Sequence, residues 1–347
     1  MAASHTGRIV NRAMGYRRLL IASAVAFAVA VTISAKKKKN QEEVTQSLDL
    51  PKEPPMVSIG ETSRLTFHVS PLSARGLLSQ QTRDALKAVL KENSGGQVVH
   101  IRAFVAGSGD ARRVPQIVSD VFTDRKQALP SVSVVQVGGL PLENAQLALE
   151  VVSRSKREVN PDGLVFIPGQ TMTAPGGGSA TAPLLEKSLD AVTAKLRGAA
   201  PLAATCFVSQ IGNPTGLLGA ISSRFPGAAV SLVQSQRAPW QALASCEAVG
   251  RGGAKIEKLA FSGTQISFGY GEKDAARAFE RLKHDLAEAA GPSAELVAAN
   301  VYALSAPVAD IARKLCPAAG ALTILPFDGV AAMDAGFAVD AIAAVSK

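Results

Sequence analysis

The chain has 347 residues, 47% hydrophobic and 19% charged, which is enough for two or three domains and gives no sign of general disorder. Its formal net charge is +9, but four arginines within residues 8–18 and four lysines at residues 36–39 supply eight of these charges. The rest of the chain is almost neutral, which excludes a nucleic-acid-binding surface on it.

The first 55 residues divide into three segments. Residues 1–18 form a basic tail, residues 19–35 carry no charge, and residues 36–55 begin with four lysines and end in a proline-rich stretch. A helix of 17 apolar residues covers most of a hydrocarbon core of about 30 Å, and the flanking basic residues reach the headgroups. We therefore expect a transmembrane helix over 19–35 and a stiff tether over 36–55. A signal peptide cleaved after Ala35 is the alternative.

The remainder of the chain contains internal repeats. The segment 132–136 recurs at 230–234, an offset of 98 residues, and the segment 164–170 is echoed more weakly at 259–265. The period is near 95 residues. The predicted units are residues 56–155, 156–253 and 254–347.

Each unit has the same expected succession of elements. A strand that ends near Phe67, Phe166 or Phe261 is followed by an amphipathic helix, a second strand and a second helix. Two more strands complete each unit, at residues 132–137 with 147–152, 230–235 with 244–249, and 322–327 with 337–343. The sequence thus predicts an α+β fold of three βαββαβ units, each a split βαβ sheet with both helices on one face.

Several motifs resemble the Rid family, also called YjgF or L-PSP endoribonuclease-like proteins, in order and spacing. In the first unit they are QTRDALKAVLKEN, RAFVAGSGDARRVPQIVSDVF, SVSVVQVGGLP and LALEVV, and GLVFIPGQ opens the second unit. The resemblance implies a chorismate-mutase-like α+β fold that assembles as a trimer. Three tandem degenerate copies in one chain would form an intramolecular pseudo-trimer.

The resemblance also implies where a catalytic cleft would lie. Deaminase members of the family hydrolyse enamines and imines, and they bind the substrate carboxylate with an arginine at the start of the third strand. A guanidinium suits this role because its planar fork binds a carboxylate through two hydrogen bonds. The corresponding positions are Val132, Val230 and Leu322, none of which binds an anion.

The acidic residue that the family carries on its last strand corresponds to Glu150, Glu247 and Asp340. Without the arginine, these acids are expected to be remnants of a cleft at best, and ordinary strand-end or interface carboxylates otherwise. The four histidines lack metal-ligand spacing, and the three cysteines contain no CxxC pair and are expected to be small buried side chains. We therefore assign no catalytic residue, metal or cofactor.

These observations favour a noncatalytic accessory or scaffold subunit of a membrane protein complex over an enzyme. Two other hypotheses stay open: a small-metabolite sensor that uses the clefts between units, and residual enamine or imine deaminase or nuclease activity. The expected partners are subunits of a membrane protein complex, the membrane through residues 19–35 and a small metabolite, but no nucleic acid and no metal. Because the N-terminus is basic and free of acids, we expect a single-pass protein of the mitochondrial or the bacterial inner membrane.

Overall fold

The computed structural model describes residues 52–93, 95–107, 109–176, 180–253, 255–317 and 319–346. The predicted basic tail, the predicted span over residues 19–35 and most of the tether lie outside the described residues. Contacts divide the chain after Leu50, and the following description concerns the unit that begins at Pro51. Among the described residues, no helix is both long enough and apolar enough to cross a membrane. The expected single-pass membrane protein therefore finds no support in the described part of the chain.

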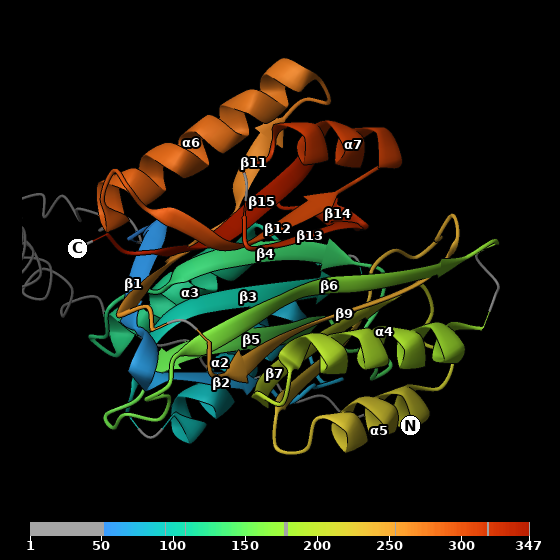
Figure 1. Cartoon of the computed structure of the whole chain (residues 1–347), viewed down its shortest axis with the longest axis horizontal. Coiled ribbons are helices and arrows are strands. Elements are labelled where there is room, and N and C mark those ends of the chain that lie inside the picture. The colour runs from blue at the N-terminus through green and yellow to red at the C-terminus, as the bar shows by residue number, and fades with distance from the viewer. Residues whose placement is uncertain are drawn as a thin grey trace, which may run out of the picture. The chain divides into compact units, whose positions relative to one another are not determined.

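Three mixed sheets with covering helices make up this unit (Figure 1). The first set is β2 (Leu65–Val69), α2 (Leu78–Glu92), β3 (Gln97–Ala106), α3 (Arg113–Asp124), β4 (Ser131–Val137) and β5 (Leu147–Arg154). The second set is β6 (Leu164–Ala174), α4 (Thr181–Leu196), β7 (Ala200–Val208), α5 (Pro214–Arg224), β8 (Ala229–Gln234) and β9 (Ala242–Arg251). The third set is β10 (Lys258–Ser262), β11 (Gln265–Phe268), α6 (Glu272–Ala290), β12 (Glu295–Ala303), α7 (Ala306–Leu315), β13 (Ala321–Pro326) and β15 (Ala335–Ala344).

The three sheets share one topology. Each runs in the order first, fourth, second and third strand, which gives β2-β5-β3-β4, β6-β9-β7-β8 and β10-β15-β12-β13. The second and third strands are parallel and are joined by a helix, whereas the other pairs are antiparallel. The succession of elements is therefore βαβαββ, a mixed α/β arrangement. It agrees with the expected succession of strand, helix, strand, helix and two strands, whereas the βαββαβ order and the α+β class assigned to that succession are wrong. The adjacent parallel strands enclose their crossover helix in a βαβ unit.

Two short strands connect the first and third sheets. Although β1 (Val57–Glu61) precedes the first set in the chain, it pairs antiparallel with β10. In return, β14 (Gly329–Val330) pairs with β4. A 3-10 turn, η1 (Thr62–Arg64), separates β1 from β2. Backbone hydrogen bonds thus join the beginning and the end of the repeat array. The unit boundaries near residues 155 and 253 stay predictions.

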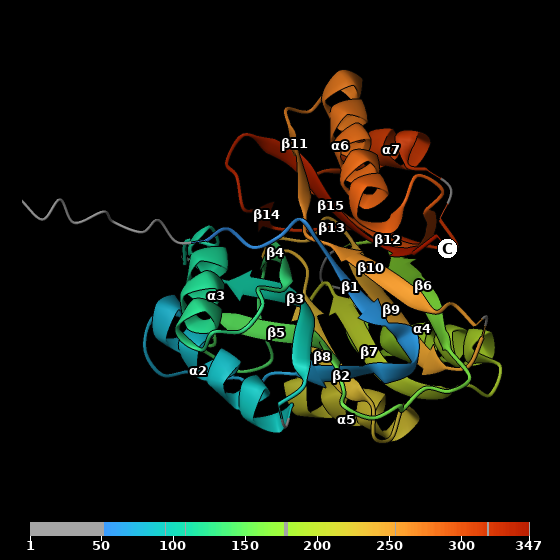
Figure 2. The same cartoon turned by 90° about the vertical axis from the view of Figure 1, so that its left-hand side faces the viewer.

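Helices cover the outer faces of the sheets, and the inner faces meet one another (Figure 2). In the first set, Leu86 and Val89 of α2 pack with Ile101 of β3, because residues three or four apart share one side of a helix. Local signals fix the helix ends, as at α5, where the Asn213 side chain accepts the Gly216 N–H and Pro214 occupies the first turn. The first strand of each set lies against the third strand of another: β2 against β8, β6 against β13 and β10 against β4.

The inner faces form two hydrophobic clusters that draw on all three sheets. The first includes Phe104, Phe207 and Tyr302, which occupy equivalent positions on the second strands. The second includes Phe261, with Phe67 and Phe166 packed against it. Burying one such side chain contributes about 1.5–3 kcal/mol, so these clusters hold the sheets together. Between the two clusters lies the site described next.

Candidate functional site

A layer of polar side chains separates the two inner hydrophobic clusters. The register places Arg102 of β3 opposite Glu150 of β5 and Ser133 of β4. The same register recurs in the other sheets, with Thr205, Glu247 and Ser231 in the second and Asn300, Asp340 and Thr323 in the third. Side chains two residues apart share a face of a strand, and the inward-facing Phe104 lies two residues beyond Arg102. We call these nine residues the central layer.

The structure brings together the three predicted acids and separates them from the three predicted arginine positions. Glu150, Glu247 and Asp340 all belong to the central layer. In contrast, the side chains at positions 132, 230 and 322 pack with the helices on the outer faces. The next residue along each strand points to the opposite, inner face of the sheet. These residues are Ser133, Ser231 and Thr323. The positions assigned to the missing arginine therefore do not face the site.

Arg102, which the sequence did not single out, is the only cation among the nine residues of the central layer. Its Nε donates to Glu150 Oε2 at 2.7 Å, and its Nη2 lies 2.6 Å from that same oxygen and 2.6 Å from Glu247 Oε1. The side chains of Arg102, Glu150 and Glu247 are only 11%, 15% and 13% exposed. Although burial opposes the charge, Glu150 and Glu247 raise the pKa of Arg102 well above its ordinary value. The guanidinium therefore stays charged between two carboxylates.

Aromatic rings and hydroxyls complete the surroundings of this cation. The guanidinium carbon lies 5.2 Å from the ring centroid of Phe104 and 5.9 Å from that of Phe207, which is within the range of cation–π attraction. The Thr205 hydroxyl donates to Glu150 Oε1 at 2.6 Å and accepts from Arg102 Nη2 at 3.2 Å. The guanidinium is thus fixed by partners from the first and second sheets.

Asp340 has a different environment, because its partners are uncharged. Its Oδ2 accepts from the Tyr302 hydroxyl at 2.8 Å, and its Oδ1 accepts from Asn300 Nδ2 at 3.2 Å. Burial raises the pKa of Asp340, while the charge of Arg102 and these hydrogen bonds oppose the rise. Burial also raises the pKa of Glu247 despite the same guanidinium. The central layer therefore contains carboxyl groups that burial inclines to hold a proton.

His100 lies two residues before Arg102 and shares its face of β3. Its Nδ1 is 3.0 Å from the Ser131 hydroxyl, and its ring stacks on Phe261 with centroids 5.9 Å apart. Burial lowers the pKa of His100 to about 3, and the positive charge of Arg102 adds to the effect. The imidazole is consequently neutral at physiological pH and acts as a hydrogen-bonded wall residue.

A cavity of about 120 Å³ borders the central layer and opens to solvent. Its polar end is lined by Arg102, Glu150, Thr205, Glu247, Asn300, Thr323 and Asp340. Its apolar walls include Phe67, Val152, Phe166, Val249, Phe261 and Ile342. The volume is comparable to the roughly 150 Å³ of an engineered cavity that binds benzene. Apolar walls with a few convergent polar groups are typical of a site for a small molecule.

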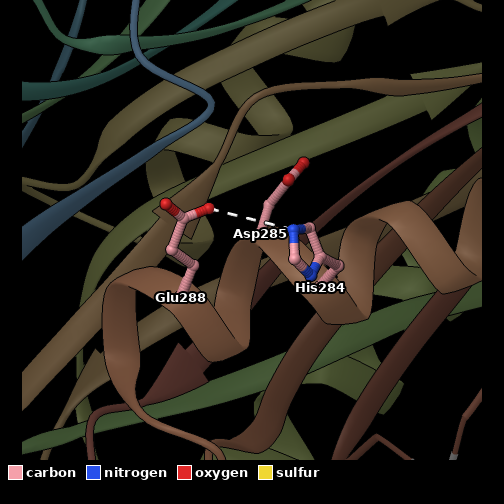
Figure 3. A group of neighbouring side chains, drawn as sticks. All are labelled: His284, Asp285 and Glu288. Atoms are coloured by element: carbon pink, nitrogen blue, oxygen red, sulfur yellow. Dashed lines mark ion pairs between the residues drawn. The ribbon is translucent and has the colours of Figure 1, made fainter.

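Outside this cavity, a possible set of metal ligands lies on α6 (Figure 3). The ligand atoms of His284, Asp285 and Glu288 lie within 4.8 Å of one another. Figure 3 shows the ion pair between His284 and Glu288, one helical turn apart on an exposed surface. Asp285 already accepts a hydrogen bond from Gln265 Nε2. We assign no metal to this group, because a metal would compete with that hydrogen bond and because two of its three ligands, His284 and Glu288, are exposed.

The second sheet contains a disulfide between Cys206 of β7 and Cys246 of β9. The two residues face each other in the antiparallel register and are buried under the helices of the second set. The expectation that the cysteines are merely small buried side chains is therefore wrong for this pair, and Cys316 is free. A separation of 40 residues provides no local motif, so only the strand register reveals the pairing.

No protein-family model matches the chain, and no curated protein matches its sequence. The chain is similar to a solved structure of cyanuric acid hydrolase, described as an evolutionary innovation by structural concatenation, with 9% identity, coverage of 81% of this chain and 100% of the other, and a TM-score of 0.25. For the cyanuric acid hydrolase of A. caulinodans the identity is 12%, the coverage 82% and 99%, and the TM-score 0.23. For a chorismatase the corresponding values are 12%, 81% and 99%, and 0.25.

These comparisons correct several predictions. The similar structures are enzymes and none is named as a Rid protein, so only the coarser inference of a chain built from concatenated repeats stands. Because the similar structures are named as enzymes, the prediction of a noncatalytic membrane-anchored scaffold and the prediction that the chain is not an enzyme lose their support. At such low TM-scores the likeness carries no information about the reaction or the substrate.

Proposed function

We propose that the cavity is an active site in which carboxyl groups transfer protons to and from a small substrate. The supporting observation is that Glu150, Glu247 and Asp340, one from each sheet, converge on the polar end of a cavity with apolar walls. Burying charge costs several kcal/mol per ion unless the charge is paired and hydrogen-bonded. Packing three sheets does not require this charge, since well-packed apolar side chains in place of a buried ion pair are often as stabilising or more so, and the charge therefore supports a functional role.

The carboxyl groups differ in their surroundings, as acid–base catalysis requires. Asp340 is hydrogen-bonded to the uncharged Tyr302 and Asn300, and burial raises its pKa, which suits it to hold a proton and donate it. Glu150 forms an ion pair with Arg102, which suits it to accept one. Enzymes assign acid and base roles by placing similar groups in different environments.

Hydrogen bonds connect the two environments. The Tyr302 hydroxyl donates to Asp340 and lies 3.5 Å from Arg102 Nη1, and Arg102 in turn holds Glu150 and Glu247. The second and third sheets add hydroxyl groups, since Thr323 donates to Glu247 Oε2 at 3.2 Å. In this proposal Arg102, Tyr302 and Thr323 orient the carboxyl groups toward a substrate.

The test is turnover by the full chain with a panel of small amides, esters and keto compounds, followed by NMR detection of products over a range of pH. We expect Asp340→Asn to lower the turnover rate at least about 100-fold, the lower end of the usual contribution of a general acid or base. Asp190→Asn is the matched control, because Asp190 lies on the exposed side of α4, where its side chain is 66% exposed. Turnover that survives Asp340→Asn, or binding of the panel in the cavity without any conversion, contradicts the proposal.

A further inference from the structure

We infer that the cavity takes a small neutral or cationic molecule that presents N–H groups, such as an amide, an amidine or a urea, and rejects anions. The inference builds on the proposed function, since it names the substrate class of the same site. It stands on the charge, the hydrogen-bonding groups and the shape of the lining.

The charge of the lining disfavours an anion. Apart from two histidines, the titratable side chains around the cavity are one guanidinium and three carboxyl groups. Glu150 and Glu247 share the single positive charge of Arg102, so their two carboxylates leave the lining negative even when Asp340 holds a proton. His100 adds no positive charge, because its pKa is about 3. An anionic ligand would therefore meet an excess of negative charge among largely buried side chains, where like charges repel strongly.

The hydrogen-bonding groups are mainly acceptors. Each carboxylate oxygen accepts more than one hydrogen bond, so Glu247 and Asp340 keep acceptor capacity beside their present partners. Among the donors of Arg102, Nε and Nη2 are directed at Glu150 and Glu247, and Nη1 faces Tyr302. A ligand rich in N–H groups complements such a lining, whereas a carboxylate or a phosphate does not.

The shape of the cavity favours a flat, ring-sized body. Phe67, Phe166 and Phe261 come from the first strands of the three sheets and form much of the apolar wall. The volume of about 120 Å³ is close to what a benzene ring requires. Aromatic faces also attract a cationic head group. Benzamidine, benzamide and benzoate are nearly isosteric probes of these features, because they share the ring and differ in charge and in N–H donors.

The experiment measures dissociation constants of the three probes for the full chain by calorimetry, with chemical-shift mapping of labelled phenylalanines to locate the ring. We expect benzamidine to bind at least tenfold more tightly than benzoate, with benzamide between them. Glu247→Gln removes one negative charge and releases part of Arg102, so it should weaken benzamidine and strengthen benzoate several-fold. Glu186→Gln is the matched control, because this glutamate lies on the exposed surface of α4 and pairs with Arg224.

The outcomes separate this inference from the proposed function. Tight benzamidine binding without turnover of any amide supports the ligand class and contradicts the acid–base chemistry. Benzoate binding as tight as benzamidine binding, or no binding of any probe, overturns the ligand class even if another compound is turned over. The ranking in the unaltered chain decides the matter if Glu247→Gln does not fold, and Glu150→Gln gives the same contrast from the first sheet.

Discussion

Replacing Arg102 by methionine removes the cation of the central layer and keeps a side chain of similar reach. Water cannot easily solvate the two carboxylates in place of the guanidinium, because the side chains of Glu150 and Glu247 are only 15% and 13% exposed. Removing one partner of a buried ion pair costs about 3–5 kcal/mol. Since two carboxylates lose the same partner, we expect a loss at the upper end, about 5 kcal/mol at pH 8, which is a large share of a typical stability of about 5–15 kcal/mol.

The loss should shrink as the pH falls. Burial raises the pKa of Glu247 and of Asp340, and the charge of Arg102 lowers both, so the variant should raise them further. A folded-state pKa above the unfolded value contributes stability at low pH, and this stability is lost as the pH rises through the folded-state pKa. Each unit of additional shift corresponds to about 1.4 kcal/mol per group. The variant should therefore be least destabilised near pH 5.

Urea unfolding followed by circular dichroism at pH 5, 6.5 and 8 measures this dependence. The variant Arg102→Met with Glu150→Gln and Glu247→Gln is the compensated control, because it removes both uncompensated charges and should recover most of the loss. A loss below about 1 kcal/mol that does not change with pH would refute the reasoning, since it would mean that water already solvates these ions.

Three further predictions concern neighbouring groups. Because the pKa of His100 is about 3 against 6.5 for a free imidazole, the chain should lose about 2 kcal/mol of unfolding free energy between pH 7 and 5. The variant His100→Asn should not show this loss, and equal losses in the two proteins, measured by urea unfolding, would contradict the prediction. Reducing the disulfide between Cys206 and Cys246, which are 40 residues apart, should lower the free energy of unfolding by about 4 kcal/mol. Urea unfolding with and without dithiothreitol measures this loss, and an unchanged midpoint would mean that the bond is absent. Tyr302→Phe should cost about 1–3 kcal/mol and raise the pKa of Asp340, because it removes a hydrogen bond at 2.8 Å that lowers this pKa; carboxyl NMR titration checks the shift.

The resemblance to the Rid family indicated the three acids on the last strand of each unit, but only as remnants of a cleft or as ordinary carboxylates. Glu150, Glu247 and Asp340 occupy the same register opposite the second strand, so their equivalence is visible in the sequence. Their meeting in one layer follows once the three sheets turn the same face inward. The elements themselves were located from hydrophobic periodicity, but the pairing of the strands was not, since periodicity carries no information on which strands are neighbours.

Arg102 escaped prediction for two physical reasons. It occurs in one unit only, because Thr205 and Asn300 take the equivalent positions, so comparison of the repeats gives no signal. It also lies in a strand that is buried on both faces, where hydrophobicity does not alternate and the inner face cannot be distinguished. The usable signal was weaker: an arginine inside a buried apolar strand requires a charged partner, and the acids of the last strand provide it.

A single arginine among three acids is possible because the three repeats belong to one chain. Symmetry-related positions in a trimer of identical chains carry identical residues, so this layer would contain three arginines or none. Three guanidinium groups would crowd and repel one another, since Thr205 Oγ1 already lies 3.2 Å from Arg102 Nη2. No guanidinium would leave three buried carboxyl groups without a cation. One chain with different residues at the three positions keeps a single cation among three acids. The charge that remains uncompensated is what a ligand with N–H groups, or a transferred proton, would neutralise.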